Sequence, residues 1–185
     1  MNLQPSTMNW KTLSSTYINK HTYFTARQDR CERPDGLIVD PYFVVELPTT
    51  VCALPITENN EVLLVKQYRH PIGQTILEIP GGFADPGEDM EKAMARELLE
   101  ETGYAFSQFD YLGKIAANPG VLDNFTYLYL AKGGKKVAAQ KLDDNEEIEI
   151  VTVSLDELKR MVRDCEIVQA LHLSCVFYAL EKLGR

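Results

Sequence analysis

Three glutamates, Glu97, Glu100 and Glu101, stand close together near the end of one predicted helix. At the helical period, Glu97 and Glu101 continue a face that starts with the apolar residues Met90 and Met94, and Glu100 flanks it. Like charges at this spacing repel, and the last turn of a helix disfavours negative charge. Carboxylates drawn toward the interior need partners, so the pattern predicts a site for one or two Mg²⁺ or Mn²⁺ ions. The alternative is a solvated acidic face.

The helix that carries these acids is predicted over residues 89–102. Gly103 follows it, at a position where a left-handed helix cap favours glycine. A Gly81-Gly82 turn precedes the helix, and two residues without side chains let the main chain approach the site closely. We interpret Arg96 as the residue that orients the carboxylates. Glu88 is expected to have a structural role, either capping the helix or pairing with Arg96.

The spacing of these residues resembles the Nudix box. The matching positions read Gly82-x5-Glu88-x7-Arg96-Glu97-Leu98-x-Glu100-Glu101-x-Gly103-Tyr104. Every charged and glycine position is filled, and Tyr104 stands where a bulky aliphatic residue is more usual. The resemblance implies an α/β/α sandwich and a hydrolase that uses Mg²⁺ or Mn²⁺ to cleave a nucleoside diphosphate linked to another group. It also implies that Glu97, Glu101 and the main-chain carbonyl of Gly81 bind the metal, and we add Glu100 from its helical spacing.

Two stretches upstream of the helix resemble the ADP-ribose pyrophosphatase branch of that family. They are Gln67-Tyr68-Arg69 and Leu77-Glu78-Ile79-Pro80-Gly81-Gly82. Arg69 is a candidate ligand of the substrate phosphate, because a guanidinium can grip phosphate with two N–H groups. Glu78 is predicted to contact the metal or a ribose, or else to form a cross-strand salt bridge.

The segment around Pro119 gives a second resemblance to the same branch. Pro119 falls sixteen residues after Gly103, a spacing typical of ADP-ribose pyrophosphatases. Those enzymes have a serine before this proline and a glutamate shortly after it, where this chain has Asn118 and Asn124. The resemblance assigns Pro119 to substrate binding. The two departures favour a broader enzyme for nucleoside diphosphate sugars, with ADP-ribose as the leading substrate and GDP-mannose as its rival.

The acidic stretch at residues 143–147 is predicted to supply the general base. In the branch that this chain resembles, a glutamate in such a loop activates the water, and the alignment favours Glu146 with Glu147 second. A carboxylate within reach of that water is chemically suited to the task. Composition alone would give a solvated loop. If neither residue acts, Glu100 in the box is the next candidate.

The rest of the pattern predicts a mixed sheet with helices on both faces, which is an α/β/α sandwich. Residues 1–45 are expected to form a small antiparallel sheet that dimerises, and residues 46–185 the Nudix domain. The expected strands of that domain are 50–55, 61–67, 75–79, 111–117, 125–131 and 148–153, and the expected helices are 89–102, 155–163 and 167–183.

Composition narrows the partners of this protein. The chain has 185 residues, is 45% hydrophobic and 25% charged, and carries a net charge of -8. These values are typical of a soluble globular protein, and the negative charge argues against nucleic acid as a partner. Four cysteines without CxxC spacing predict reduced thiols in a cytoplasmic protein rather than a zinc site. We expect no signal peptide and no membrane span.

The predicted protein is therefore a homodimeric hydrolase that converts a nucleoside diphosphate sugar to a nucleoside monophosphate and a sugar phosphate. One alternative is a Nudix hydrolase of nucleoside triphosphates or dinucleoside polyphosphates, against which Pro119 and the N-terminal sheet argue. Another is a non-catalytic ligand sensor with a Nudix-like fold. The complete set of box acids and the lack of a basic recognition helix argue against the sensor.

Overall fold

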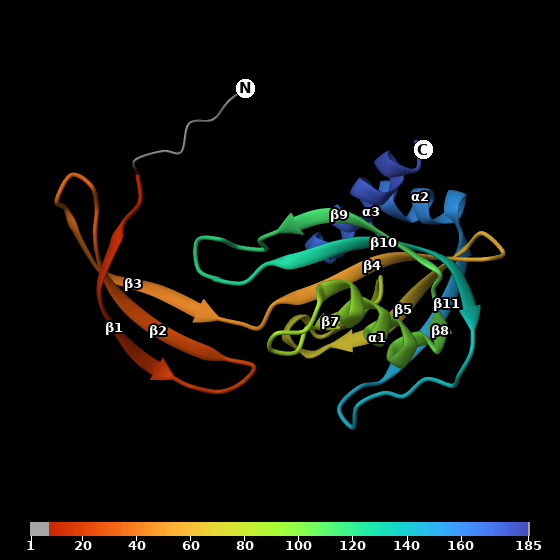
Figure 1. Ribbon diagram of the computed structural model, residues 1–185, viewed down its shortest axis with the longest axis horizontal. Helices are drawn as coiled ribbons and strands as arrows, with labels where there is room; N and C mark the ends of the chain where they lie inside the picture. The colour runs from red at the N-terminus through yellow and green to blue at the C-terminus, as the bar shows by residue number, and fades with distance from the viewer. Residues whose placement is uncertain (1–7, 185) are drawn as a thin grey trace. The chain divides into compact units, whose positions relative to one another are not determined.

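The computed structural model describes residues 8–184, which divide into two units (Figure 1). The N-terminal unit contains the chain up to Pro48 together with the segment Asn118–Asn124. The large unit contains Thr49–Ala117 and the chain from Phe125 onward. Residues 118–124 thus belong with the N-terminal sheet, although they are far from it in sequence.

The large unit is built on an eight-stranded mixed sheet. Its strands are β4 (Thr50–Thr57), β5 (Glu61–Arg69), β6 (Gln74–Glu78), β7 (Gly81–Phe83), β8 (Tyr104–Ala105), β9 (Gln108–Ile115), β10 (Thr126–Lys136) and β11 (Ile148–Ser154). The central order is β11-β5-β4-β10-β8, while β6 pairs with β5, β7 with β4 and β9 with β10. Strands β4 and β10 run parallel, and the other paired strands are antiparallel.

Helices cover both faces of this sheet because the side chains of β4 alternate between two buried layers. Val51 and Ala53 pack with α1 (Met90–Thr102) in one cluster. Cys52 and Leu54 pack with α2 (Leu155–Arg163) and α3 (Ala170–Lys182) in the other. A fully buried leucine such as Leu54 contributes about 2 kcal/mol to folding. The predicted α/β/α sandwich is confirmed, and Figure 1 shows α1 on one side of the sheet.

Capping side chains set the ends of the helices. The Asp89 carboxylate accepts the N–H of Lys92 at the start of α1, and Gly103 ends the helix with a φ of 71°. A side chain at Gly103 would also overlap the carbonyl of Ala138. The hydroxyl of Ser154 accepts the N–H of Glu157 and starts α2, whose observed bounds match the predicted 155–163.

Some elements differ from expectation, and each difference has a local cause. Helix α3 begins at Ala170 rather than at residue 167, because the Gln169 side chain caps it by accepting the N–H of His172. The short strands β7 and β8 and the 3₁₀ turn His70–Ile72 were not predicted. Strands of two or three residues are too short for a periodic pattern to reveal.

The N-terminal unit is a three-stranded antiparallel sheet of β1 (Lys11–Asn19), β2 (Thr25–Glu32) and β3 (Ile38–Glu46). Segment 118–124 joins it, because the Tyr42 hydroxyl donates to the carbonyl of Gly120 at 3.1 Å and Val45 bridges to Leu122. Among the described residues of this unit, only Asp29 and Cys31 are buried.

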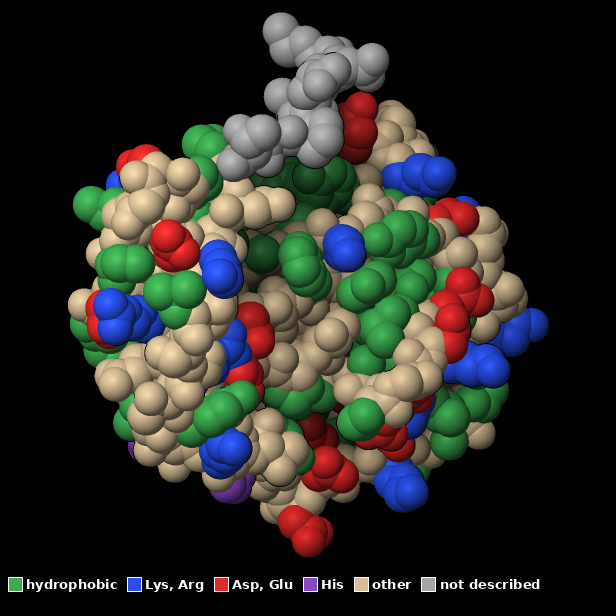
Figure 2. All heavy atoms as spheres, turned by 60° about the vertical axis from the view of Figure 1, so that its left-hand side comes forward, with side chains coloured by type: hydrophobic (Ala, Val, Ile, Leu, Met, Phe, Trp, Pro, Cys, Tyr) green, Lys and Arg blue, Asp and Glu red, His purple; other side chains and the backbone are tan. Residues whose placement is uncertain are grey.

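Large apolar side chains of this unit lie open to solvent. They are Met8, Trp10, Leu13, Tyr17, Ile18, Tyr23, Phe24, Leu37, Ile38 and Phe43. Figure 2 brings the N-terminal side of the molecule forward and shows hydrophobic side chains at the surface among charged ones. A sheet this small buries too little apolar surface to be firmly stable by itself.

Candidate active site

The Gly81-Gly82 turn brings the main chain against the acidic end of α1. Strand β7 pairs Gly81 with Cys52 of β4, and the Gly81 N–H donates to Glu101 Oε2 at 3.0 Å. A Cβ atom at Gly82 would overlap the carboxylate of Glu97. At Gly81 a Cβ atom would overlap the main chain of β4, so the close approach of the turn depends on glycine there, as the sequence predicted.

Arg96 holds the carboxylates around it in fixed orientations. Its Nη1 contacts Glu97 Oε1 at 2.8 Å and Glu100 Oε2 at 3.1 Å. Its Nη2 contacts Glu88 Oε2 at 3.0 Å and donates to the carbonyl of Phe83 at 2.9 Å. Glu88 thus pairs with Arg96, while Asp89 caps the helix. These contacts support the role of Arg96 as the residue that orients the acids.

Burial makes this part of the site electrostatically costly. Burial raises the pKa of Glu101 to about 8, with the charges of Glu97 and Glu146 acting in the same direction. The Gly81 N–H and the charge of Arg69 partly offset that rise. Burial also raises the pKa of Glu97 to about 6, against the lowering effect of Arg96. Cations that bind here would lower both pKa values.

The residues present fit a divalent cation. Glu97 and Glu101 supply hard oxygen donors on one face of α1, and both are mostly buried. Arg96 shares its single positive charge among several acids, so negative charge is left for a cation to neutralise. As they stand, no three acidic, histidine or cysteine side chains among residues 8–184 are grouped so that they could hold an ion. Glu97 and Glu100 are held in ion pairs with Arg96 instead.

The segment 136–141, which we call the strap, covers the carbonyl groups at the end of α1. Main-chain N–H groups of Val137 and Ala138 donate to the Gly103 carbonyl, and that of Lys141 donates to Glu100. Two side chains also donate to main-chain carbonyls. Lys136 Nζ donates to the carbonyl of Thr102 and Gln140 Nε2 to the carbonyl of Glu101, both at 2.7 Å. The strap thereby satisfies carbonyls that every helix leaves without partners inside the helix.

The strap also carries the chain toward the predicted general base. Gln140 Nε2 donates a second hydrogen bond, to the Ile148 carbonyl at the start of β11, at 3.2 Å. Residues 143–147 lie between these two anchors, and Glu146 Oε2 accepts the N–H of Asp143 at 3.1 Å. The charge of Glu146 raises the pKa values of Glu97 and Glu101. This favours Glu146 over the exposed Glu147, although the assignment of the base stays a prediction.

Arg69 and Glu78 form an ion pair with each other. Arg69 Nε and Nη2 contact Glu78 Oε2 at 2.8 Å and 2.7 Å, which is the salt bridge that sequence analysis gave as one alternative for Glu78. The carboxylate of Glu78 is buried, while the Arg69 side chain is 42% exposed. Arg69 therefore keeps N–H groups that can contact a ligand.

Pro119 belongs to the N-terminal unit, whereas the box residues belong to the large unit. It sits in a turn in which the N–H groups of Val121 and Leu122 donate to the carbonyl of Asn118. Asn124 Nδ2 donates to the Pro48 carbonyl at 3.0 Å, a contact that an ionised glutamate could not make. The role of Pro119 in substrate binding stays a prediction.

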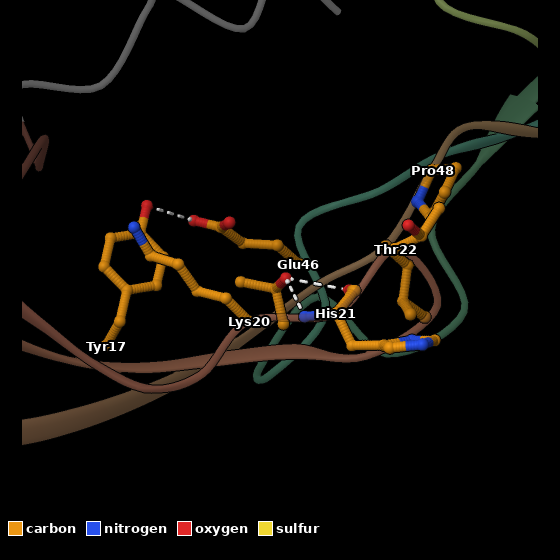
Figure 3. A pocket seen from close by; sticks show the side chains of 8 residues that line it. Tyr17, Lys20, His21, Thr22, Glu46 and Pro48 are labelled. Carbon is orange, nitrogen blue, oxygen red and sulfur yellow. Dashed lines mark hydrogen bonds between the residues drawn. The ribbon is translucent and has the colours of Figure 1, made fainter.

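The N-terminal unit has an open hollow of about 670 Å³ that shares no residue with the box (Figure 3). It is lined by Tyr17, Lys20, His21, Thr22, Thr25, Glu46, Leu47 and Pro48. Figure 3 shows the Tyr17 hydroxyl directed at Glu46, and Lys20 Nζ lies 3.9 Å from the centroid of the Tyr17 ring. Nothing in the sequence pattern indicated this hollow.

Comparison with known proteins agrees with the fold and identifies the family. The NUDIX domain model matches residues 46–170, and the model of a nucleoside diphosphate sugar hydrolase N-terminal domain matches residues 10–45. The chain therefore belongs to the Nudix family, as its box predicted. It is a Nudix pyrophosphohydrolase, and hydrolases of this family generally use divalent metal ions.

Individual relatives extend over most of the chain. A methanol dehydrogenase activator from Bacillus methanolicus is 34% identical, with 91% of each chain covered. ADP-ribose pyrophosphatases from Mycobacterium tuberculosis and Bacillus subtilis are 31% and 32% identical, covering 90% and 69% of this chain and 81% and 69% of their own. A crystal structure of an ADP compounds hydrolase shares the fold, with a TM-score of 0.83, 22% identity, and coverage of 98% and 97%.

No helix among the described residues is both long and apolar enough to cross a membrane.

Proposed function

We propose that this protein hydrolyses the pyrophosphate bond of nucleoside diphosphate sugars to a nucleoside monophosphate and a sugar phosphate. ADP-ribose is the leading substrate, and GDP-mannose is the second. The observation that carries the proposal is the half-buried Glu97 and the buried Glu101, packed against the Gly81-Gly82 turn, with the charge of Glu146 acting on both. The match of residues 10–45 to a nucleoside diphosphate sugar hydrolase domain and the names of two relatives support the substrate class.

In this proposal, Glu97, Glu101 and the Gly81 carbonyl hold Mg²⁺ or Mn²⁺, with Glu100 beside them. The ion, when bound, neutralises charge on the phosphoryl oxygens. Glu146 takes a proton from the attacking water, and the effect of its charge on the pKa values of the box acids supports that role.

Other residues bind and orient. Arg96 holds the box carboxylates in position through its ion pairs. Arg69 binds the substrate diphosphate, with Glu78 fixing its guanidinium from behind. Pro119 is assigned to substrate binding by its resemblance in spacing from Gly103 to ADP-ribose pyrophosphatases.

A side-by-side substrate assay tests the proposal. We expect kcat/KM for ADP-ribose and GDP-mannose to lie within about two orders of magnitude, roughly 3 kcal/mol of transition-state discrimination. The reason is that Asn118 and Asn124 replace the serine and glutamate of stricter enzymes. A nucleoside triphosphate should be a much poorer substrate, because it ends in a phosphate where a nucleoside diphosphate sugar carries the sugar that the substrate site would hold. The triphosphate dGTP is measured under the same metal condition. A clear preference for dGTP would contradict the proposed substrate class and leave the Nudix chemistry intact.

We also propose that the protein is a homodimer formed through the N-terminal unit. The exposed apolar side chains of its three strands form a surface that a second copy of this chain could cover. An isologous interface of this kind would bury the sheet that has little core of its own.

Sedimentation equilibrium at micromolar concentration should therefore report a dimer. Ile18→Asp, at a side chain 61% exposed on β1, should shift the protein toward monomer, because it places a charge on the apolar surface. Ile72→Asp is the matched control at an exposed isoleucine of the large unit. Deleting residues 1–45 should cause aggregation, since segment 118–124 loses Tyr42 and Val45. A wild-type monomer would exclude this arrangement.

A cytoplasmic location completes the proposal. All four cysteines are free thiols, and Cys31, Cys52 and Cys175 are buried. Free thiols persist in reducing compartments, and the cytoplasm is one of these.

A further inference from the structure

A buried polar chain links Arg69, at the end of β5, to helix α3. Glu78 is 1% exposed, and its Oε2 atom contacts the Arg69 guanidinium. Its other oxygen, Oε1, faces Nδ1 of His172 at 3.8 Å. Within residues 8–184, this Nδ1 is the only buried side-chain nitrogen or oxygen without a hydrogen-bond partner. Three elements, β5, β6 and α3, therefore meet at one carboxylate.

The His172 nitrogen lacks a partner, and the Glu78 oxygen that faces it can accept a hydrogen bond. A buried carboxylate oxygen needs a donor, and a buried imidazole N–H needs an acceptor. An ordinary N–H···O bond is about 2.9 Å long, so a movement of about 0.9 Å would close the gap. Burial lowers the pKa of His172 to about 3, and the charge of Arg69 acts in the same direction. The neutral imidazole still has one N–H, which the Nδ1 tautomer directs at Glu78.

We propose that His172 is a positioning residue for substrate binding: it fixes Glu78, and Glu78 holds the Arg69 guanidinium toward the diphosphate. This inference rests on the proposed function, in which Arg69 binds the substrate phosphates. Arg69 uses Nε and Nη2 for Glu78, so its Nη1 group stays available to a ligand. The charge of the guanidinium also lowers the pKa of Glu101 in the box.

A purely structural histidine would behave differently. The main-chain N–H of His172 is already satisfied by the Gln169 side chain, which begins α3 whatever side chain residue 172 carries. A core role would need only the volume of the ring. The positioning role requires the N–H at Nδ1, so substitutions of similar size that keep or remove a donor separate the two.

The experiment compares kcat and KM for ADP-ribose, under one saturating metal condition, in a set of full-length variants. His172→Leu removes the donor, and we expect KM to rise about tenfold with kcat changed less than about twofold, because ground-state and transition-state binding are lost together. His172→Asn keeps an N–H near the Nδ1 position and should restore most of the loss. Val176→Ala, one turn further along α3 and fully buried, is the control that loosens the core without touching Glu78. It should lower stability and leave KM unchanged.

Arg69→Ala separates failure of this inference from failure of the proposed function. We expect Arg69→Ala to raise KM more than His172→Leu does, and the double variant to show no further rise. If Arg69→Ala raises KM and His172→Leu does not, the role of His172 is excluded and the role of Arg69 stands. If Arg69→Ala leaves KM unchanged, both assignments are wrong.

A spectroscopic measurement tests the same contact without activity. The ¹⁵N signals of His172 in the folded wild-type protein should show the tautomer protonated at Nδ1. The signals of His70, which lies in the exposed 3₁₀ turn, serve as the reference within the same protein. A His172 ring protonated only at Nε2 would overturn the proposal even if His172→Leu failed to fold.

Discussion

Glu101→Gln should lower kcat by about a hundredfold or more, the largest loss expected from a single substitution in the box. Glu101 accepts the Gly81 N–H and lies beside Glu97, so its carboxylate is central to the set that would hold the cation. Glutamine keeps the size and one acceptor oxygen but removes the negative charge. The loss should therefore appear as weak metal binding and slow turnover, measured by Mn²⁺ titration and by kcat at saturating Mg²⁺.

The fold of Glu101→Gln should survive, and the metal-free variant should be at least as stable as the wild type. Burial and the neighbouring carboxylates raise the pKa of Glu101 to about 8, so the ionised form is costly to bury. Glu91→Gln is the matched control, because it makes the same change at an exposed glutamate in the first turn of α1. Near-wild-type turnover of Glu101→Gln under saturating Mg²⁺ would rule out this metal site.

Glu146→Gln should lower kcat by about 10²–10⁴-fold and change KM little. The carboxylate acts on the water and not on the substrate, so its loss should slow the chemical step without weakening binding. The effect of its charge on the pKa values of Glu97 and Glu101 motivates this choice. The measurement is a full rate profile against substrate concentration at saturating metal.

Two variants in the same loop make the test specific. Asp144→Asn removes a neighbouring exposed charge and should leave kcat within about twofold. Glu147→Gln tests the adjacent residue, and a loss there without a loss at Glu146 would show that the alignment is shifted by one. If neither glutamate affects kcat, Glu100 becomes the candidate base.

Much of this fold could be predicted because its signals are local. The end of α1 at Gly103 and the start of α2 after Ser154 follow from capping chemistry that involves neighbouring residues. The two covered faces of the sheet follow from continuous apolar runs such as residues 51–55 of β4, in which successive side chains point to opposite faces. The box acids were found for the same reason, since helical spacing alone places Glu97 and Glu101 on one face.

The contacts that sequence analysis missed join residues far apart in the chain. His172 lies on an apolar helix and approaches Glu78 only through the tertiary fold, so no spacing signal points to it. Gln140 reaches the end of α1 across 39 residues. Pro119 was recognised by its spacing, but nothing local shows that its segment belongs with the N-terminal sheet. Pairings of this kind depend on topology, which periodicity does not encode.

The hydrogen bonds of the strap determine which of its positions can change during evolution. Three of its five hydrogen bonds to residues 100–103 use main-chain N–H groups, at Val137, Ala138 and Lys141, which any residue except proline provides. Only Lys136 and Gln140 contribute through their side chains. The segment that supports the acidic end of the helix is therefore free to vary at most positions while its geometry persists. Related chains could keep the same support with little recognisable similarity there.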